Sequence, residues 1–141
     1  MKRIGFLSFG HWGDAYGSQV RTAAAALVQS LELAVAAEAL GADGAYFRVH
    51  HFARQLGSPF PLLAAIGART RTIEIGTAVI DMRYENPMYM AEDAGAADII
   101  AGGRLQLGIS RTATRASRET LPARLVGYQV SETPRNCVRK R

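Results

Sequence analysis

Hydrophobic positions along the chain follow two different periods, and the order in which these periods alternate predicts its architecture. Short runs rich in β-branched and aromatic residues predict strands. Longer runs of strong helix formers, with apolar residues three or four positions apart, predict helices between them. The predicted strands are Ile4–Phe9, a run within Gly44–Phe52, Ile73–Asp81 and Arg104–Ile109.

Capping residues mark where each helix begins and ends. Thr22 is the predicted N-cap of the first helix, which Gly41 ends. Ser58-Pro59 and Asn86-Pro87 each place a cap residue before a proline that suits the first helical position. The third helix is expected to end at Ala101, before two glycines. In the first helix, residues recur at the helical spacing at Leu27, Leu31, Ala34, Val35 and Glu38. In the second helix we expect a buried stripe made of Leu62, Leu63 and Ile66.

Strands that alternate with helices indicate a parallel sheet joined by right-handed crossovers. Both a doubly wound sheet and a (β/α)8 barrel have this rhythm. A dinucleotide-binding sheet would carry a G-x-G-x-x-G loop after its first strand, and the glycines of residues 8–17 do not have that spacing. The pattern therefore predicts an α/β fold of four strand-helix units and weakens the dinucleotide-binding alternative, while both architectures stay open.

Two adjacent histidines, His50 and His51, fall where the second predicted strand ends. Ligands and catalytic side chains usually lie at the carboxyl ends of parallel strands. A histidine in such a loop can also be an ordinary hydrogen-bonding or surface residue. Because neighbouring residues of an extended strand point to opposite faces, we expect at most one of the pair to face a given pocket.

Length and composition exclude several classes of protein. The 141 residues suffice for one domain with a core. No apolar run approaches the roughly 20 residues of a membrane helix, and the opening MKRIGFLSFG is better interpreted as a strand than as a signal peptide. The single cysteine, Cys137, excludes an internal disulfide and a cysteine metal cluster. We expect a cytoplasmic protein.

The net charge of +5 is confined to the end of the chain. Residues 1–110 hold nine basic and ten acidic side chains, whereas residues 111–141 hold eight basic and two acidic ones. Residues 112–141 also lack an apolar period, so we expect a basic tail that is disordered or derived from a frameshift, after a domain of residues 1–111. Tyr128 is the only aromatic residue there, which does not favour nucleic-acid binding.

Several spaced motifs resemble one family of enzymes. They are VHHF at the second strand, SPFPLLAAIGARTRTIEIGTAVI, AED at Ala91–Asp93 and the ending GGRLQLGISR. Over about residues 1–111, the chain resembles the bacterial luciferase-like flavin-dependent monooxygenases. The resemblance implies a (β/α)8 barrel that binds reduced FMN, or a deazaflavin in some branches, at the carboxyl ends of its strands. It also implies addition of one oxygen atom from O2 to a small organic substrate.

The resemblance also assigns roles to individual residues. His50 and His51 match the paired histidines of the family, the first of which is associated with acid-base chemistry beside the flavin. Ala78 and Val79 match the position of a cis peptide that lies against the flavin ring. Ser110 stands where bacterial luciferases carry a cysteine near the reactive flavin carbon, and Arg111 matches an arginine that could pair with the flavin phosphate.

Half a barrel has consequences for partners and activity. A flavin and a small organic substrate are the expected ligands, and a flavin reductase is a possible supplier of reduced FMN. Unpaired edges on the two outer strands would favour a homodimer or larger oligomer. The alternative to an enzyme is a half barrel that binds flavin without catalysis or associates with itself.

Overall fold

The computed structural model describes residues 3–110, which form a single parallel sheet with three α-helices. Arg111 and the expected tail of residues 112–141 lie outside the described residues. The elements in chain order are β1 (Gly5–Ser8), α1 (Ala23–Ala39), β2 (Gly44–Arg48), α2 (Pro59–Arg69), β3 (Glu74–Asp81), the short 3-10 helix η1 (Met82–Tyr84), α3 (Pro87–Ile100) and β4 (Leu105–Ser110).

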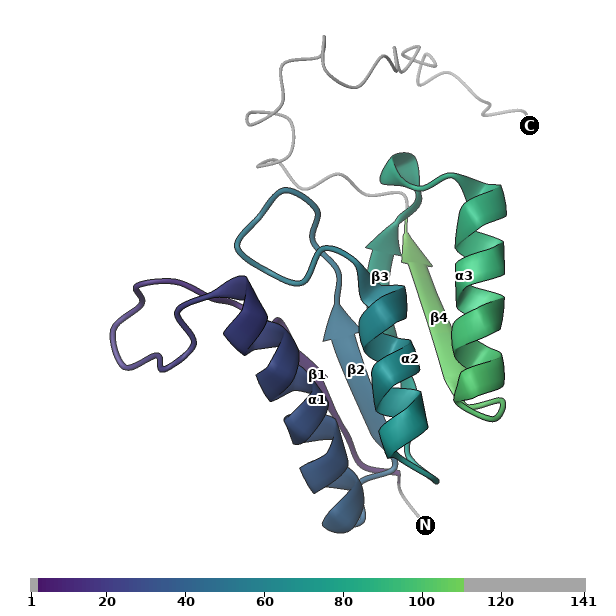
Figure 1. Cartoon of the computed structure of the whole chain (residues 1–141), viewed down its shortest axis with the longest axis horizontal. Helices are drawn as coiled ribbons and strands as arrows, with labels where there is room; N and C mark the ends of the chain where they lie inside the picture. Colours follow the sequence, from purple (N-terminus) through teal and green to yellow (C-terminus); the bar gives the residue numbers. More distant parts are fainter. Residues whose placement is uncertain (1–2, 111–141) are drawn as a thin grey trace, which may run out of the picture.

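The order of the strands in the sheet is the order of the strands in the chain. β1 pairs with β2, β2 with β3 and β3 with β4, all in parallel. All three α-helices lie on one face of this sheet (Figure 1). A doubly wound sheet reverses its order at a switch point and carries helices on both faces. The arrangement is therefore the barrel type that the sequence predicts.

The predicted helix boundaries are confirmed by the capping contacts. The Thr22 hydroxyl accepts a hydrogen bond from the Ala25 amide (3.1 Å), and the Asn86 side chain accepts one from the Met88 amide (3.0 Å). Gly41, just after the end of α1, has a φ of 82°, a conformation that favours glycine. α2 begins at Pro59 as expected, although its N-cap Ser58 makes no side-chain capping bond.

Two apolar clusters fill the space between the helices and the sheet. The larger includes Phe47 of β2, Leu63 and Ile66 of α2 and Ile75 of β3, none of them more than 1% exposed. The smaller packs Phe60 and Met90 against Ile80. Burying each such side chain contributes about 1.5–3 kcal/mol. The predicted buried face of α2 is confirmed.

The helical face that the sequence predicts for α1 is confirmed in part. Ala34 is buried and Leu31 packs against the larger cluster, but Leu27 is 44% exposed, and Ala26 and Ser30 are buried instead. Small side chains at spacings of four residues allow the helix to lie close to the sheet. In a helix composed mostly of alanine and leucine, this close approach shifts the buried face from Leu27 towards Ala26 and Ser30.

Arg104 connects the ends of three elements near the amino-terminal ends of the strands. Its guanidinium donates hydrogen bonds to the carbonyls of Gly67 (2.9 Å), Thr70 (3.0 Å), Ile73 (2.7 Å) and Ala101 (2.7 Å), and to the Thr70 hydroxyl (3.0 Å). These carbonyls belong to the carboxyl ends of α2 and α3, including the cap residues Thr70 and Ala101, and to Ile73, which directly precedes β3. One side chain thus satisfies backbone acceptors that helix ends leave without partners.

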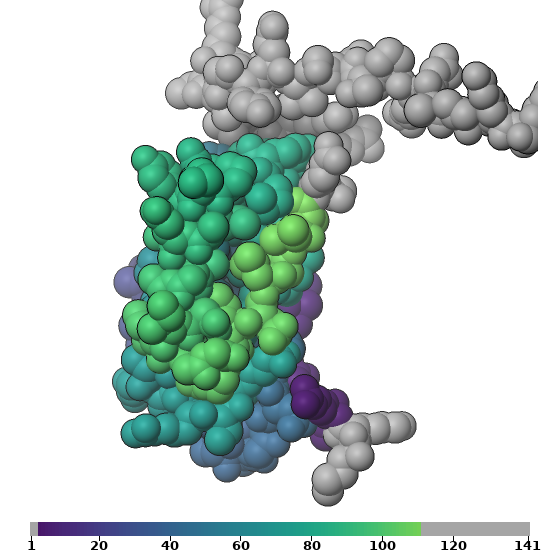
Figure 2. Space-filling view, turned by 90° about the vertical axis from the view of Figure 1, so that its right-hand side faces the viewer, coloured from purple at the N-terminus to yellow at the C-terminus, as the bar shows by residue number. Residues whose placement is uncertain are grey.

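The sheet has two unpaired edges and one open face. β4 lies at the surface beside α3 (Figure 2), and β1 is the opposite edge. Leu107 and Ile109 of β4 are 39% and 57% exposed, and Leu7 of β1 is 50% exposed. Within residues 3–110, no helix is long and apolar enough to cross a membrane. The fold is therefore half of a barrel, and no element among residues 3–110 covers its inner face or its two edges.

Glu38 makes a second set of contacts near the amino-terminal ends of the strands. One carboxylate oxygen of Glu38, near the end of α1, accepts hydrogen bonds from the amides of Arg71 (2.8 Å), Thr72 (2.7 Å) and Ile73 (3.0 Å). Desolvation acts to raise the pKa of Glu38, but these donors outweigh it and lower the pKa to about 2. The ionised carboxylate therefore fixes the turn that leads into β3.

We predict that Glu38 makes the stability of the domain fall in acid. Its folded-state pKa lies below the ordinary value of 4.5, so its contribution is fully present above pH 4.5 and is lost as the pH falls towards 2. Glu38→Gln should lower the free energy of unfolding at pH 7 by about 1–2 kcal/mol and flatten its pH dependence in that window. Urea unfolding between pH 2 and 7 measures both effects.

Glu32 supplies the control, because it is exposed on the same helix. Glu32→Gln removes the same charge and should leave both the stability and its acid dependence nearly unchanged. Equal effects of the two substitutions would contradict the assignment to Glu38.

Candidate functional site

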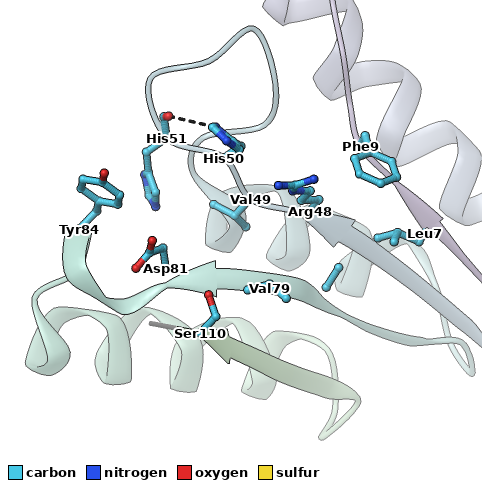
Figure 3. A pocket seen from close by; sticks show the side chains of 11 residues that line it. Leu7, Phe9, Arg48, Val49, His50, His51, Val79, Asp81, Tyr84 and Ser110 are labelled. Atoms are coloured by element: carbon cyan, nitrogen blue, oxygen red, sulfur yellow. Dashed lines mark hydrogen bonds between the residues drawn. The ribbon is translucent and has the colours of Figure 1, made fainter. Parts of the chain in front are cut away.

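A cavity of about 460 Å³ lies at the carboxyl ends of the strands (Figure 3). All four strands or the residues that follow them contribute to its wall. The lining residues are Leu7, Phe9, Arg48, Val49, His50, His51, Ala78, Val79, Asp81, Tyr84 and Ser110. The cavity therefore includes five of the six residues that the sequence singles out, and the sixth, Arg111, lies outside the described residues.

The floor of the cavity is a bulge in β3. Thr77 pairs with Leu107 and Ile80 with Ile109, so Ala78 and Val79 together oppose the single residue Gly108. The Thr77 hydroxyl bridges the irregularity, because it accepts from the Gly108 amide and donates to the Gly108 carbonyl, both at 2.8 Å. A β-carbon on Gly108 would lie only 2.6 Å from the Thr77 carbonyl oxygen, which explains the glycine.

The bulge differs in one respect from what the resemblance implies. No cis peptide bond occurs among residues 3–110, so the bond between Ala78 and Val79 is trans. The extra residue of the bulge, rather than a cis bond, presents this backbone to the cavity. Val79 is 41% exposed there and offers an apolar surface.

Both histidines face the cavity, which corrects the expectation that at most one of them would. The reason is that the chain leaves the extended conformation after Arg48. The His50 amide donates to the Leu56 carbonyl (2.9 Å), which closes a loop, and Phe52 adopts a φ of 58° that is rare for a bulky residue. The alternation rule of a strand no longer applies in this loop.

His51 is the more enclosed imidazole. Its Nε2 lies 3.1 Å from a carboxylate oxygen of Glu85, and its ring centroid lies 5.3 Å from that of Tyr84. The His51 side chain is only 16% exposed. The neighbouring His50 Nδ1 lies 3.3 Å from the His51 carbonyl oxygen. A proton on that nitrogen leaves the lone pair of the ring on Nε2.

Asp81 and Ser110 are register partners at the ends of β3 and β4, and both line the cavity. The Asp81 carboxylate accepts hydrogen bonds from the Arg83 amide (3.1 Å) and from Arg83 Nε (3.0 Å). Its negative charge is therefore balanced by an arginine of η1. Ser110 contributes a hydroxyl to the wall at the position assigned from the resemblance.

Sequence reasoning missed several residues of the wall, including Phe9, Arg48, Asp81 and Tyr84. Each stands within a few residues of the carboxyl end of a predicted strand. Listing polar and aromatic residues at all strand ends, instead of searching for motifs, could have found them. Glu85 carries no signal of its own in the sequence, because its partner His51 approaches it only through the fold.

Comparison with known proteins places the chain in a family. The family model for luciferase-like monooxygenases matches residues 1–124, and the chain belongs to that family. The match continues past Arg111, and the boundary expected there stays a prediction. The chain is 34% identical over 85 residues to the 4-hydroxyprotoasukamycin monooxygenase of Streptomyces nodosus subsp. asukaensis, which is 59% of this chain and 23% of the relative.

Another relative and two solved structures extend the comparison. The oxygenase component of a flavin-dependent trigonelline monooxygenase from Acinetobacter baylyi is 30% identical over 87 residues, or 60% of this chain and 24% of the relative. The oxygenating constituent of 3,6-diketocamphane monooxygenase from Pseudomonas putida, solved with FMN, has a TM-score of 0.71 at 22% identity. That alignment covers 81% of this chain and 31% of the other.

The coenzyme F420-dependent tetrahydromethanopterin reductase of Methanopyrus kandleri has a TM-score of 0.55 at 21% identity, with 75% and 25% of the two chains covered. These two structural likenesses concern the fold alone. The chain spans about a quarter of the length of the two curated relatives.

We predict that the Thr77 hydroxyl holds the floor of the cavity in place. Thr77→Val keeps the shape but leaves the amide and carbonyl of Gly108 without this partner, and should lower the free energy of unfolding by about 1–3 kcal/mol. Thr77→Ser keeps the hydroxyl and should retain most of the stability. Urea unfolding of the two variants is the measurement, and similar stabilities would show that the bridging is unimportant.

Proposed function

We propose that this chain forms the flavin site of a luciferase-like monooxygenase that uses reduced FMN and O2 to oxidise a small organic substrate. The observation that carries the proposal is the convergence of His50, His51, the Ala78–Val79 bulge and Ser110 on one cavity. These residues come from three strand ends that are far apart in the sequence. Membership in the family supports the same chemistry.

The cavity suits a planar aromatic cofactor. Its volume of about 460 Å³ lies within the range of about 300–1,000 Å³ that is usual for ligand sites. Ala78 and Val79 would present backbone and a small apolar side chain to the flavin ring. When bound, a reduced flavin supplies the electrons that O2 accepts.

His50 is the proposed acid-base residue. An imidazole can take up or release a proton near neutral pH without a large energetic cost. The contact of Nδ1 with the His51 carbonyl orients the ring and favours Nε2 as the proton acceptor. His51, enclosed by Tyr84 and paired with Glu85, is better suited to hold the loop and its neighbour in position.

FMN is the proposed cofactor, with a deazaflavin as the alternative. The structural neighbour from Pseudomonas putida was solved with FMN, and the one from Methanopyrus kandleri is named for coenzyme F420. Arg111 is the proposed partner of the flavin phosphate. Because the relative from Acinetobacter baylyi is named an oxygenase component, we propose a separate flavin reductase as a partner in the cytoplasm.

We predict that His50→Ala lowers reduced-FMN-dependent oxidation of an aldehyde or ketone by about 10²–10⁴-fold, because the acid-base step loses its proton carrier. The affinity for FMN should change little. Product formation across a panel of aldehydes and ketones, together with an FMN fluorescence titration, measures the two effects. His11→Ala is the control, because His11 is exposed, stacks on Phe9 and does not line the cavity.

Absence of FMN binding by the unaltered chain would refute the proposed flavin site. If FMN binds but His50→Ala oxidises substrate as fast as the unaltered chain, His50 has a structural role only.

A second candidate function is self-association, which the uncovered sheet favours. β1 and β4 are the two edge strands of a parallel sheet. In a dimer, β4 of each copy could pair with β1 of the other copy, which would close an eight-stranded barrel. Exposed Leu7, Leu107 and Ile109 would become buried in such an assembly. The half barrel would then hold flavin without necessarily catalysing oxidation.

We predict that the purified chain has twice its monomer mass by light scattering coupled to size exclusion, and that Ile109→Lys shifts it to the monomer. A lysine on an edge strand opposes edge-to-edge pairing. Leu40→Lys is the control, since Leu40 is 89% exposed at the end of α1 and lies on neither edge. A monomer in the unaltered chain would rule out the closed two-chain barrel.

A further inference from the structure

Arg48 stands in the cavity wall although no motif includes it. It is the last residue of β2, at a register shift that pairs it with Val79 of the β3 bulge. Its guanidinium carbon lies 5.4 Å from the centroid of the Phe9 ring. Figure 3 shows the guanidinium on the Phe9 side of the cavity, away from Tyr84 and Asp81.

The carboxylates near the carboxyl-terminal ends of the strands are already paired with other groups. Asp81 is held by Arg83, and Glu85 lies against His51. Among residues 3–110, Arg48 has no acidic partner, and its guanidinium lies over the Phe9 ring. The positive charge in the wall of the cavity is therefore not balanced by this part of the protein.

The surroundings of Arg48 make that imbalance significant. Leu7, Phe9, Val49 and Val79 offer no side-chain acceptor for the five N–H donors of a guanidinium. Arg48 is half-buried, so its guanidinium loses part of its hydration beside these apolar walls. Contact with the face of the Phe9 ring offsets part of that loss, and an anionic group that entered the cavity would pair with the charge directly.

We propose that Arg48 is the specificity-determining residue of the cavity and that it recognises a carboxylate on an apolar substrate. The planar fork of a guanidinium matches the two oxygens of a carboxylate. The apolar body of the substrate would lie against Leu7 and Val79. This inference deepens the proposed function and rests on it, because the substrate would share the cavity with the flavin.

The test compares an acid with its neutral analogue of the same shape. Phenylacetate and phenylacetamide are titrated into the full 141-residue chain, and binding is followed by chemical-shift changes or calorimetry. Phenylacetate should bind more tightly by about tenfold or more, and added salt should weaken its binding alone. Arg48→Met should remove this preference without changing the affinity for the amide, whereas Arg48→Lys should retain part of it.

Arg54 provides a matched control for the loss of charge. Its guanidinium carbon lies 5.8 Å from the centroid of the Trp12 ring, so it is also a cation on an aromatic face, but it does not line the cavity. Arg54→Met should leave the preference for phenylacetate unchanged. The comparison of acid and amide in the unaltered chain needs no variant, so it remains decisive if a variant folds poorly.

A flavin phosphate is the other source of a negative charge, and parallel titrations with FMN and riboflavin separate the two. If Arg48→Met removes a preference for FMN over riboflavin and not the preference for the acid, Arg48 binds the cofactor and the inference is overturned. Equal affinities for acid and amide in the unaltered chain also overturn it. Acid preference through Arg48 without flavin binding would support the recognition by Arg48 while refuting the proposed function.

Discussion

The guanidinium of Arg104 is the contact on which the arrangement of the elements depends. Five hydrogen bonds from one side chain connect the carboxyl ends of α2 and α3 with Ile73, which directly precedes β3. Helix ends expose carbonyls that need partners, and a buried acceptor without one costs about 1–3 kcal/mol. Because all these acceptors meet at one point, the two helices and the strand are fixed relative to each other before any ligand binds.

The two ends of the sheet therefore have different physical characters. At the amino-terminal ends of the strands, the charged side chains of Arg104 and Glu38 form hydrogen bonds with backbone groups of the protein itself. At the carboxyl-terminal ends of the strands, a bulge interrupts the pairing of β3 with β4, and Phe52 adopts a left-handed conformation. Arg48 lines the cavity there without an acidic partner among the described residues. Rigidity at one end permits unsatisfied and strained groups at the other, where a ligand can use them.

Strong local signals made most of the fold predictable, including the helix starts at Thr22 and Asn86 and the β-branched run of β3. The buried face of α1 was predictable only in part, because its many alanines let the close approach to the sheet bury Ala26 and Ser30 rather than Leu27. The location of the histidines followed from the strand that precedes them. Their shared orientation did not, since the chain leaves the extended conformation after Arg48 and the His50 amide bonds to the Leu56 carbonyl. The positions of Arg48 and Glu85 beside their partners arise only from contacts across the fold.

The agreement between chain order and strand order has a consequence for how such a protein is made. Each strand after the first pairs with the strand that precedes it in the sequence, and α2 and α3 pack against the strands that follow them, β3 and β4. A ribosome that releases the chain from its amino end supplies every new strand after the edge that it must join has already formed. The half barrel can therefore assemble unit by unit during translation, and at every stage the most recent strand is the template for the next.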